Sequence, residues 1–325
     1  MLGKLRSSVT LVIHNAWPVN FKVSSQSFRP QFERLVNLID FVVTASMSPH
    51  PLLISSFSSV MFDRGDSIRN PEQVIYAEST IGPNRYAESK YVAELLLDYA
   101  AQKLAITTSL ARIGQVAGAA HHAGLWPKTE WFPGLIQSSL HVGALPVSLG
   151  ATFGRIDWVP MDILADVLVE IALSEFQGTE NEGRLAHAGN IEMARSHSCV
   201  YHPLHPHPVM WKALRGIVAE ELSSFSVHPL EIISLDSWLA RVRQGAHRTS
   251  DSSQSWTEKD LDASLLVNPA VKLLDFFEEV LGAQDQKGNV LEIEKTLEVS
   301  PKLRRLPEYK VEWMQKWIRD WMESS

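Results

Sequence analysis

Two tyrosine–lysine pairs lie in one stretch of the chain, RYAESKYVAELLLDYAAQK, which runs from Arg85 to Lys103. Tyr86 precedes Lys90, and Tyr99 precedes Lys103, by about one helical turn. A free tyrosine has a pKa of about 10 and is a poor acid at neutral pH, whereas an adjacent ammonium favours the phenolate and lowers that pKa. Either pair is therefore a candidate for donating a proton to a carbonyl oxygen.

Helical geometry separates the two pairs. The spacing of apolar residues predicts one long helix from about Tyr86 to Leu104. Tyr86 and Lys90 share a face at the start of this helix, directly after a loop, where a side chain can reach a cleft. Tyr99 lies about 220° further round the helix. The second pair is therefore expected to face solvent or a neighbouring helix.

Two consecutive serines strengthen the first pair as a candidate. The stretch PLLISSFSSV, residues 51–60, predicts a buried strand that runs into hydroxyl residues, among them Ser55 and Ser56. Ligands of a parallel sheet bind beyond the carboxyl ends of its strands. A serine hydroxyl and Tyr86 are therefore expected in the same crevice, where the serine can hold a carbonyl oxygen while Tyr86 gives it a proton.

Strands and helices alternate through the first half of the chain. Apolar strands are predicted at about 9–16, 51–60 and 105–118, with helices at about 31–44 and 86–104. This alternation is typical of a parallel sheet covered by helices on both faces. The last part of the chain is mainly helical. Tryptophans at helical spacing in its tail, at positions 313, 317 and 321, are expected to dock on the core.

Composition excludes several classes of protein. The net charge of −7 and the pI of about 6.0 argue against a nucleic-acid-binding surface. The single cysteine, Cys199, excludes disulfides within the chain and suits a reducing compartment. No apolar run is long enough to span a membrane. The sequence therefore predicts a soluble, cytoplasmic protein.

Two groups of ionisable side chains receive a structural rather than a functional interpretation. His202, His205 and His207 in HPLHPHP have no local carboxylate and are interpreted as surface histidines, so no metal site is expected. Glu88 and Glu94, on the predicted tyrosine helix, are interpreted as part of a solvated face.

The order strand, Ser-Ser, then Tyr-x-x-x-Lys resembles the extended short-chain dehydrogenases/reductases. The finer resemblance is to the thioester reductase domains of fungal nonribosomal-peptide-synthetase-like and carboxylic-acid-reductase-like enzymes, of the male-sterility NAD(P)-binding type. It covers nearly the whole chain from Val12 onward. The resembling stretches, in family order, are VIHNAWPVNF, LLISSFSSV, RYAESKYVAELLL, LARIGQVAG, LWPKTEWFPGLIQSS, LPVSLG, IDWVPMDILADVL and NPAVKLLDFFE.

The resemblance implies roles for individual residues. Ser56 would bind the carbonyl oxygen, with Ser55 as the alternative if the register is shifted by one. Tyr86 would donate the proton, and Lys90 would hold the nicotinamide ribose hydroxyls. The remaining residues of the cofactor groove would be Asn15, Ala16, Ser55, Ile113, Gly114 and Gln115. Trp126, Lys128 and Trp131 would lie near the substrate entrance, with a buried aromatic cluster as the competing interpretation.

The resemblance also implies the fold: an incomplete Rossmann-type, doubly wound parallel sheet with a mostly helical C-terminal substrate domain. Residues 1–174 would be the C-terminal part of the NAD(P)-binding domain, with 119–155 as a substrate-side insertion. Residues 175–325 would form a helical substrate or lid domain, and one strand near 198–203 would return to the sheet.

The implied activity is NADPH-dependent reduction of an acyl thioester, held on the phosphopantetheine of an acyl carrier protein, or of an aldehyde.

The chain departs from the family at the phosphate-binding loop. Its first 64 residues contain one glycine, Gly3, and no Thr-Gly-x-x-Gly-x-x-Gly loop occurs anywhere in it. Arg85 stands where the family usually has glycine. Weak NADPH binding is expected, with the loop supplied by an upstream segment or a second chain. The alternatives are a catalytically silent remnant and another extended short-chain enzyme, such as a sugar-nucleotide epimerase.

Overall fold

A computed structural model describes nine stretches of the chain. They are residues 2–19, 24–61, 69–77, 81–82, 84–124, 126–185, 197–250, 268–278 and 290–323, with the side chains of 175–185 and 246–250 excluded. The chain divides into two compact units, each discontinuous in sequence. The sheet unit comprises Met1–Val116, Ile163–Pro206 and Asn289–Leu306; the aromatic unit comprises Ala117–Asp162, His207–Gly288 and Pro307–Ser325.

The sheet unit is built on four parallel strands in the order β1-β2-β4-β9. In this register Ser56 lies opposite Ile113, so the strands end together at one edge of the sheet. The strands are β1 (Leu11–His14), β2 (His50–Ser56), β4 (Ser109–Ile113) and β9 (Cys199–Tyr201).

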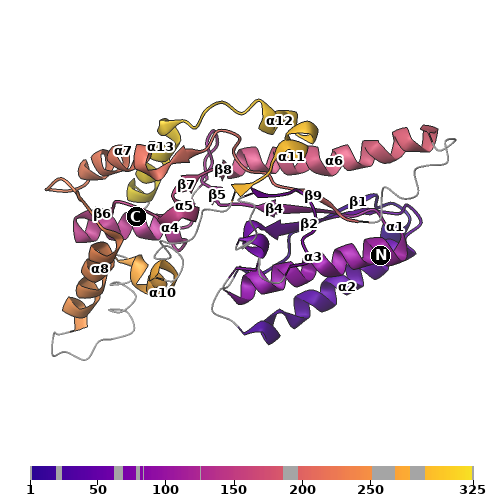
Figure 1. Ribbon diagram of the computed structural model, residues 1–325, viewed down its shortest axis with the longest axis horizontal. Helices are drawn as coiled ribbons and strands as arrows, with labels where there is room; N and C mark the ends of the chain where they lie inside the picture. The colour runs from indigo at the N-terminus through magenta and orange to yellow at the C-terminus, as the bar shows by residue number, and fades with distance from the viewer. Residues whose placement is uncertain are drawn as a thin grey trace. The chain divides into compact units, whose positions relative to one another are not determined.

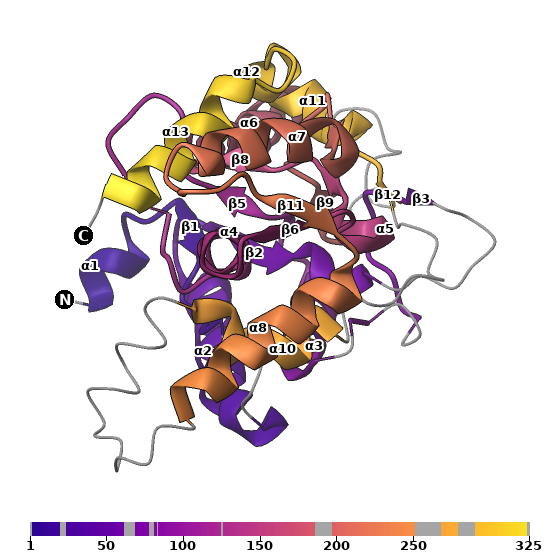
Figure 2. The ribbon, with the colours of Figure 1, turned by 90° about the vertical axis from the view of Figure 1, so that its left-hand side faces the viewer.

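Helices cover both faces of this sheet. Helices α2 (Arg29–Thr44) and α3 (Arg85–Leu104) lie on one face, and α6 (Met161–Leu185) lies on the other (Figures 1 and 2). The unit is therefore a doubly wound, Rossmann-type sheet, as the sequence predicted. Residue 174, where the sequence predicted a domain boundary, lies inside α6.

The start of α3 is defined by a side-chain cap. The Asn84 side chain accepts a hydrogen bond from the backbone N–H of Ala87 at 2.9 Å, which satisfies one of the free N–H groups of the first turn. Tyr86 therefore sits in that first turn, directly after a loop. The helix ends at Leu104, and the residue that caps it, Ala105, has a left-handed φ of 52°.

Shorter elements complete the sheet unit. β3 pairs with β12 in parallel, and this pairing brings the segment after residue 289 back to the unit. The elements are α1 (Leu2–Arg6), η1 (Ser25–Phe28), η2 (Phe57–Val60), β3 (Arg69–Asn70), β12 (Val290–Leu291), α11 (Glu294–Val299) and α12 (Pro301–Arg304).

The aromatic unit contains helices and short strand pairs. β6 (Ala144–Pro146) runs parallel to β11 (Glu231–Ile233), and β7 (Arg155–Ile156) runs antiparallel to β10 (Val209–Met210). The helices are α4 (Trp131–Val142), α5 (Gly150–Phe153), α7 (Trp211–Ser223), α8 (Leu235–Ser250), η4 (Pro269–Leu273), α10 (Leu274–Phe276) and α13 (Val311–Glu323). A further two-stranded pair is formed by β5 (Val116–Ala117), whose first residue belongs to the sheet unit, and β8 (Val159–Pro160).

The tryptophan stripe of α13 docks on the core of its unit, as predicted. Trp313, Trp317 and Trp321 are all buried. The indole N–H of Trp317 donates to the carbonyl oxygen of Ala119, and that of Trp321 donates to the carbonyl oxygen of Trp126, both at 3.0 Å. The indole dipoles are thus satisfied inside an apolar cluster.

Two interpretations made from the sequence are wrong. His202 and His205 are buried rather than on the surface, although His207 is exposed. Glu94 is also buried, on the sheet-facing side of α3, whereas Glu88 is half-buried. Each residue is polar and was assigned to solvent by type, but tertiary partners compensate for its burial, as described below.

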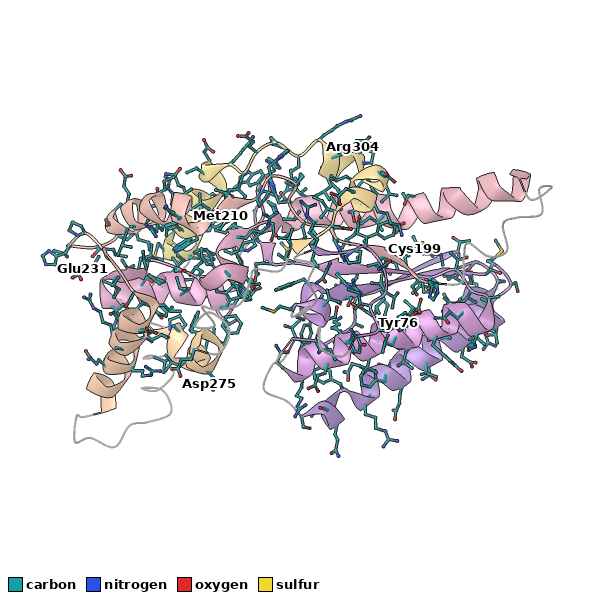
Figure 3. All side chains as sticks on the ribbon, in the orientation of Figure 1. Tyr76, Cys199, Met210, Glu231, Asp275 and Arg304 are labelled. Carbon is teal, nitrogen blue, oxygen red and sulfur yellow. The ribbon has the colours of Figure 1, made fainter. Side chains whose placement is uncertain are left out.

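None of the helices within the described ranges is long and apolar enough to cross a membrane. Figure 3 shows the side chains of both units; Tyr76 and Cys199 belong to the sheet unit, and Met210, Glu231 and Asp275 to the aromatic unit.

Candidate active site

Ser56 and Tyr86 meet at the carboxyl end of the sheet. Their side chains are hydrogen-bonded to each other. The Ser56 hydroxyl oxygen also accepts from the Ser58 N–H at 3.3 Å and from the Ser58 hydroxyl at 3.0 Å. Because Ser58 engages both lone pairs of the Ser56 oxygen, the Ser56 proton is the donor in the bond to the Tyr86 oxygen, and a carbonyl oxygen bound beside Tyr86 could accept the same proton.

A close backbone contact brings the loop before α3 to this serine. The Gly82 N–H donates to the Ser58 carbonyl oxygen at 2.9 Å. A Cβ at Gly82 would lie 2.9 Å from that same oxygen, so only glycine permits the approach. The contact ties the segment that leads into Tyr86 to the turn that follows Ser56.

Lys90 lies one turn beyond Tyr86 and is buried. Its Nζ donates to the carbonyl oxygen of Ile54 at 2.7 Å and lies 4.9 Å from the Trp17 ring centroid and 5.8 Å from that of Tyr86. Burial lowers the pKa of Lys90 to about 7, and the nearby Glu94 carboxylate opposes this shift.

The effect of Lys90 on the pKa of Tyr86 differs from the expectation. Burial raises the pKa of Tyr86 to about 12, and the hydrogen bond with Ser56 offsets this shift only in part. The predicted lowering by a neighbouring ammonium does not dominate, because the phenol is desolvated and Lys90 itself holds its proton weakly.

The predicted cofactor-groove residues lie at the carboxyl ends of β1 and β4, the two strands on either side of β2. Asn15 and Ala16 follow β1 and are exposed, whereas Ile113, Gly114 and Gln115, at the end of β4, are half-buried. Gly114 packs closely on Leu204, whose Cδ2 would lie 2.5 Å from an added Cβ. The parallel register therefore brings these residues to the same edge as Ser56.

His14, at the end of β1, is a site residue that the sequence did not single out. Its Nε2 is buried and has no hydrogen-bond partner within the described ranges. Burial lowers the pKa of His14, and the nearby Lys90 adds to this effect. A single histidine in a strand carries no sequence signal, so only the fold could reveal its place beside Lys90.

Ser55 points away from Tyr86, into a buried network. Its hydroxyl donates to the Glu94 carboxylate, and Glu94 forms an ion pair with Arg112 at 2.8 Å. Arg112 in turn contacts His202, with 3.3 Å between Nη1 and Nε2. This network explains why Glu94 and His202 tolerate burial: each has a polar partner.

The predicted substrate-side residues belong to the aromatic unit. Trp126 is buried, with its ring centroid 5.7 Å from that of Trp158 and 5.4 Å from that of Trp317. Its indole N–H donates to the Glu130 carboxylate at 2.8 Å. Lys128 and Trp131 are half-buried and keep part of their surface accessible. Trp126 thus packs as a core residue of its unit.

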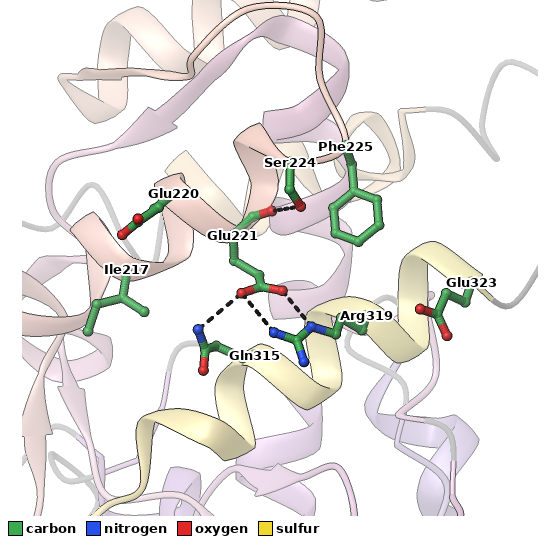
Figure 4. Close-up of a pocket in the computed structure, with 8 residues that line it drawn as sticks. All are labelled: Ile217, Glu220, Glu221, Ser224, Phe225, Gln315, Arg319 and Glu323. Carbon is green, nitrogen blue, oxygen red and sulfur yellow. Dashed lines mark hydrogen bonds and ion pairs between the residues drawn. The ribbon is translucent and has the colours of Figure 1, made fainter.

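A polar pocket of about 540 Å³ lies between α7 and α13 of the aromatic unit (Figure 4). It contains none of the predicted site residues. Its Glu221 carboxylate is bound by Arg319, with 2.7 Å between Oε1 and Nε, and by Gln315, at 3.1 Å (Figure 4). Its lining is formed by Ile217, Glu220, Glu221, Ser224, Phe225, Gln315, Arg319 and Glu323. The carboxylate of Glu221 is therefore already paired within the pocket.

The donor set suits the nicotinamide-ribose end of a dinucleotide. Lys90 donates one N–H to the carbonyl oxygen of Ile54 and has further N–H groups that can bind a ligand. The buried Nε2 of His14 has no hydrogen-bond partner in the part of the chain that the structure describes. Both groups stand near the predicted proton donor, Tyr86. For a metal ion, no group of three or more His, Cys, Asp or Glu ligands occurs among the described residues.

Comparison with known proteins gives the family. The family model described as Male sterility protein, an NAD-binding domain, matches residues 1–168. A carboxylic acid reductase of Neurospora crassa is 29% identical over 323 residues, which cover 98% of this chain but 28% of that protein. The chain thus spans less than a third of the length of this relative.

Solved structures show the same fold. The terminal R domain from the myxalamid PKS-NRPS biosynthetic pathway has a TM-score of 0.70 at 17% identity, covering 99% of this chain and 70% of that one. A thiolation-reductase di-domain from an archaeal non-ribosomal peptide synthetase has a TM-score of 0.64 at 16% identity, covering 98% and 58%. The family match over residues 1–168 shows that the chain belongs to the male sterility family of NAD-binding domains.

Proposed function

We propose that this protein is an NADPH-dependent reductase of acyl thioesters that acts in the cytoplasm. The observation that supports this most directly is the contact between Ser56 and Tyr86, with Lys90 one turn further along α3. These three side chains stand at the carboxyl end of a parallel sheet, where ligands of such sheets bind.

Each of the three residues has a distinct task in the proposed reaction. Ser56 donates a hydrogen bond to the carbonyl oxygen of the thioester, and Tyr86 transfers its phenolic proton to that oxygen. Lys90 binds ribose hydroxyls through the N–H groups that Ile54 leaves available. NADPH, when bound, supplies the hydride that reduces the carbonyl carbon. The C–S bond then breaks, and an aldehyde and a thiol leave.

We propose that Ser56, not Ser55, binds the carbonyl oxygen. Ser56 bonds to Tyr86, whereas Ser55 donates to Glu94. Adjacent side chains of a strand point to opposite faces, so only one of the two serines can face the tyrosine. We assign Asn15, Ala16 and the segment 113–115 to the cofactor groove on the same ground of strand position.

The proposed partner is an acyl carrier protein that presents the acyl group on phosphopantetheine. Support comes from the family and from the fold shared with a thiolation-reductase di-domain. Lys128 and Trp131, which keep accessible surface, are proposed to contact the acyl-pantetheine arm, and Trp126 to support them from the core.

We further propose that these 325 residues bind NADPH weakly by themselves. The sequence contains no glycine-rich loop whose backbone N–H groups could meet the pyrophosphate at a helix N-terminus. Calorimetric titration of the chain with NADPH tests this directly. A dissociation constant in the low micromolar range would contradict the proposal.

Activity is tested in a chain extended by a glycine-rich N-terminal segment of the family. An acyl-pantetheine thioester and NADPH are supplied, and aldehyde, free thiol and oxidised cofactor are measured together. The three products are expected in equal amounts when reduction stops at the aldehyde. If the extended chain binds NADPH but releases no thiol, the protein is a catalytically silent member of the family and the proposed reaction is wrong.

A further inference from the structure

A buried carboxylate occupies the third position of the catalytic face of α3. Tyr86, Lys90 and Glu94 succeed one another at intervals of four residues, so they lie along one side of the helix, toward the sheet. Glu94 is 1% exposed. A carboxylate buried this completely requires a charged partner or several hydrogen bonds.

Arg112 of β4 provides the charged partner. Its Nε lies 3.2 Å and 3.1 Å from the two carboxylate oxygens of Glu94, and its Nη2 lies 2.8 Å from Oε2. The guanidinium also donates to the carbonyl oxygen of Gln73 at 3.1 Å and contacts His202. Such a bidentate pair with its remaining donors engaged is fixed in orientation.

The same carboxylate holds the residues on both sides of Ser56. Ser55 donates to Glu94 from the strand, and Ser59 lies 2.7 Å from the same oxygen of Glu94. The Ser59 hydroxyl also lies 2.8 Å from the carbonyl oxygen of Ser56 itself. The turn that carries Ser56 is therefore attached to α3 at two points besides its contact with Tyr86.

We propose that Glu94 and Arg112 are a positioning pair, which holds the Ser56 hydroxyl at Tyr86 through Ser55 and Ser59. Neither charged residue would touch the substrate. The assignment of Ser56 and Tyr86 as reacting groups rests on the proposed function, but their mutual placement does not. The pair acts at the start of η2, because the Ser59 hydroxyl contacts the backbone carbonyl oxygen of Ser56, the residue that caps η2.

The first test measures placement without any activity. The ¹³Cζ resonance of a labelled tyrosine reports the hydrogen bond at its phenolic oxygen, and Tyr86→Phe assigns the signal. Ser56→Ala removes the hydroxyl that bonds to Tyr86 and gives the reference position of the Tyr86 resonance. Ser59→Ala is expected to move the resonance toward that reference position. Replacing the pair together, by Glu94→Leu with Arg112→Met, is expected to do the same without leaving a single buried charge.

Glu88→Gln is the matched control, because this half-buried carboxylate lies on the same helix and contacts Arg85 and Ser25 rather than Ser55 or Ser59. It is expected to leave the Tyr86 resonance unchanged. If the resonance in Ser59→Ala coincides with that of the wild type while the protein remains folded, the positioning role is wrong. If the double variant unfolds, Ser59→Ala still decides the question, because it removes only one hydroxyl.

The second test uses kinetics in the extended chain. Ser59→Ala is expected to lower kcat roughly 10- to 100-fold with KM little changed, since misplacing a catalytic group affects the transition state more than substrate binding. An unchanged kcat would overturn the proposal. Absence of any reductase activity in the wild type would contradict the proposed function instead, and the resonance test would still decide the positioning role.

Discussion

Helix α3 carries the same Tyr-x-x-x-Lys spacing twice, and its two ends place the pairs in opposite environments. At the start of the helix Tyr86 and Lys90 are buried, at 8% and 3% exposure. Near its end Tyr99 is 61% exposed and Lys103 is exposed as well. The comparison teaches that the spacing sets only the distance between the two side chains, whereas their chemistry depends on what surrounds them.

The partners of the two pairs differ as much as their burial. Tyr86 bonds to Ser56, and Lys90 donates to Ile54 beneath the Trp17 ring. For the second pair the recorded contact is that of Lys103 Nζ with the Tyr99 ring, at 6.0 Å from the centroid. A tyrosine surrounded by water gains nothing as a positioned acid, so we expect only the first pair to act in catalysis.

The largest effect is expected from Tyr86→Phe. This change removes only the phenolic oxygen, so the fold should persist. General-acid catalysis contributes typically about 10²–10⁴-fold, and kcat for thioester reduction should fall by that order with KM little changed. Steady-state kinetics in the extended chain measure the effect. Full activity in this variant would break the distinction between the two pairs.

A smaller effect is expected on the pH dependence of folding. The pKa of Lys90 is lowered to about 7 from an ordinary value of about 10.5, so the unfolded chain binds more protons between those two values. The contribution of Lys90 to stability therefore rises with pH across that window. In Lys90→Met, the increase in unfolding free energy between pH 7 and pH 10 should be smaller than in the wild type.

Urea denaturation at several pH values measures this slope. Lys103→Met is the matched control, because it removes an exposed lysine from the other pair of the same helix. It should leave the slope of the wild type unchanged. Equal slopes in all three proteins would show that the environment of Lys90 does not weaken its hold on a proton.

The smallest effect is expected from Tyr99→Phe. Its ring faces solvent, and substitutions at such surface positions usually change stability by no more than about 0.5 kcal/mol. Neither kcat nor the melting temperature should differ measurably from the wild type. A large loss of activity here, with Tyr86→Phe silent, would reverse the assignment.

Much of the candidate site could be predicted from the sequence, because the placement of its residues depends on local spacing. The period of the apolar residues predicted α3. The position of Tyr86 at the start of this helix, next to a loop, favoured it over Tyr99 as the candidate proton donor. The apolar run before Ser55 and Ser56 predicted a buried strand, and alternation of strands and helices predicted a parallel sheet. These features follow from helix and strand periodicity, which act within a few residues.

The polar network of Glu94, Arg112 and His202 could not be predicted from local spacing. Glu94 and His202 belong to residue types that usually face solvent, so both were predicted to lie at the surface. Their partner, Arg112, is 18 positions from Glu94 and 90 from His202 along the chain. Nothing in the local pattern of either residue specifies an arginine at that distance.

The sequence by itself determined which side chains could do the chemistry, namely a tyrosine and a lysine on one helix face and a serine at the end of a strand. The tertiary structure decided which serine faces the tyrosine, and it placed Lys90 where burial lowers its pKa. It also gave Glu94 a buried arginine on a neighbouring strand. The reason is physical: periodicity is fixed by the local backbone, whereas desolvation and ion pairing require groups that only the folded chain brings together.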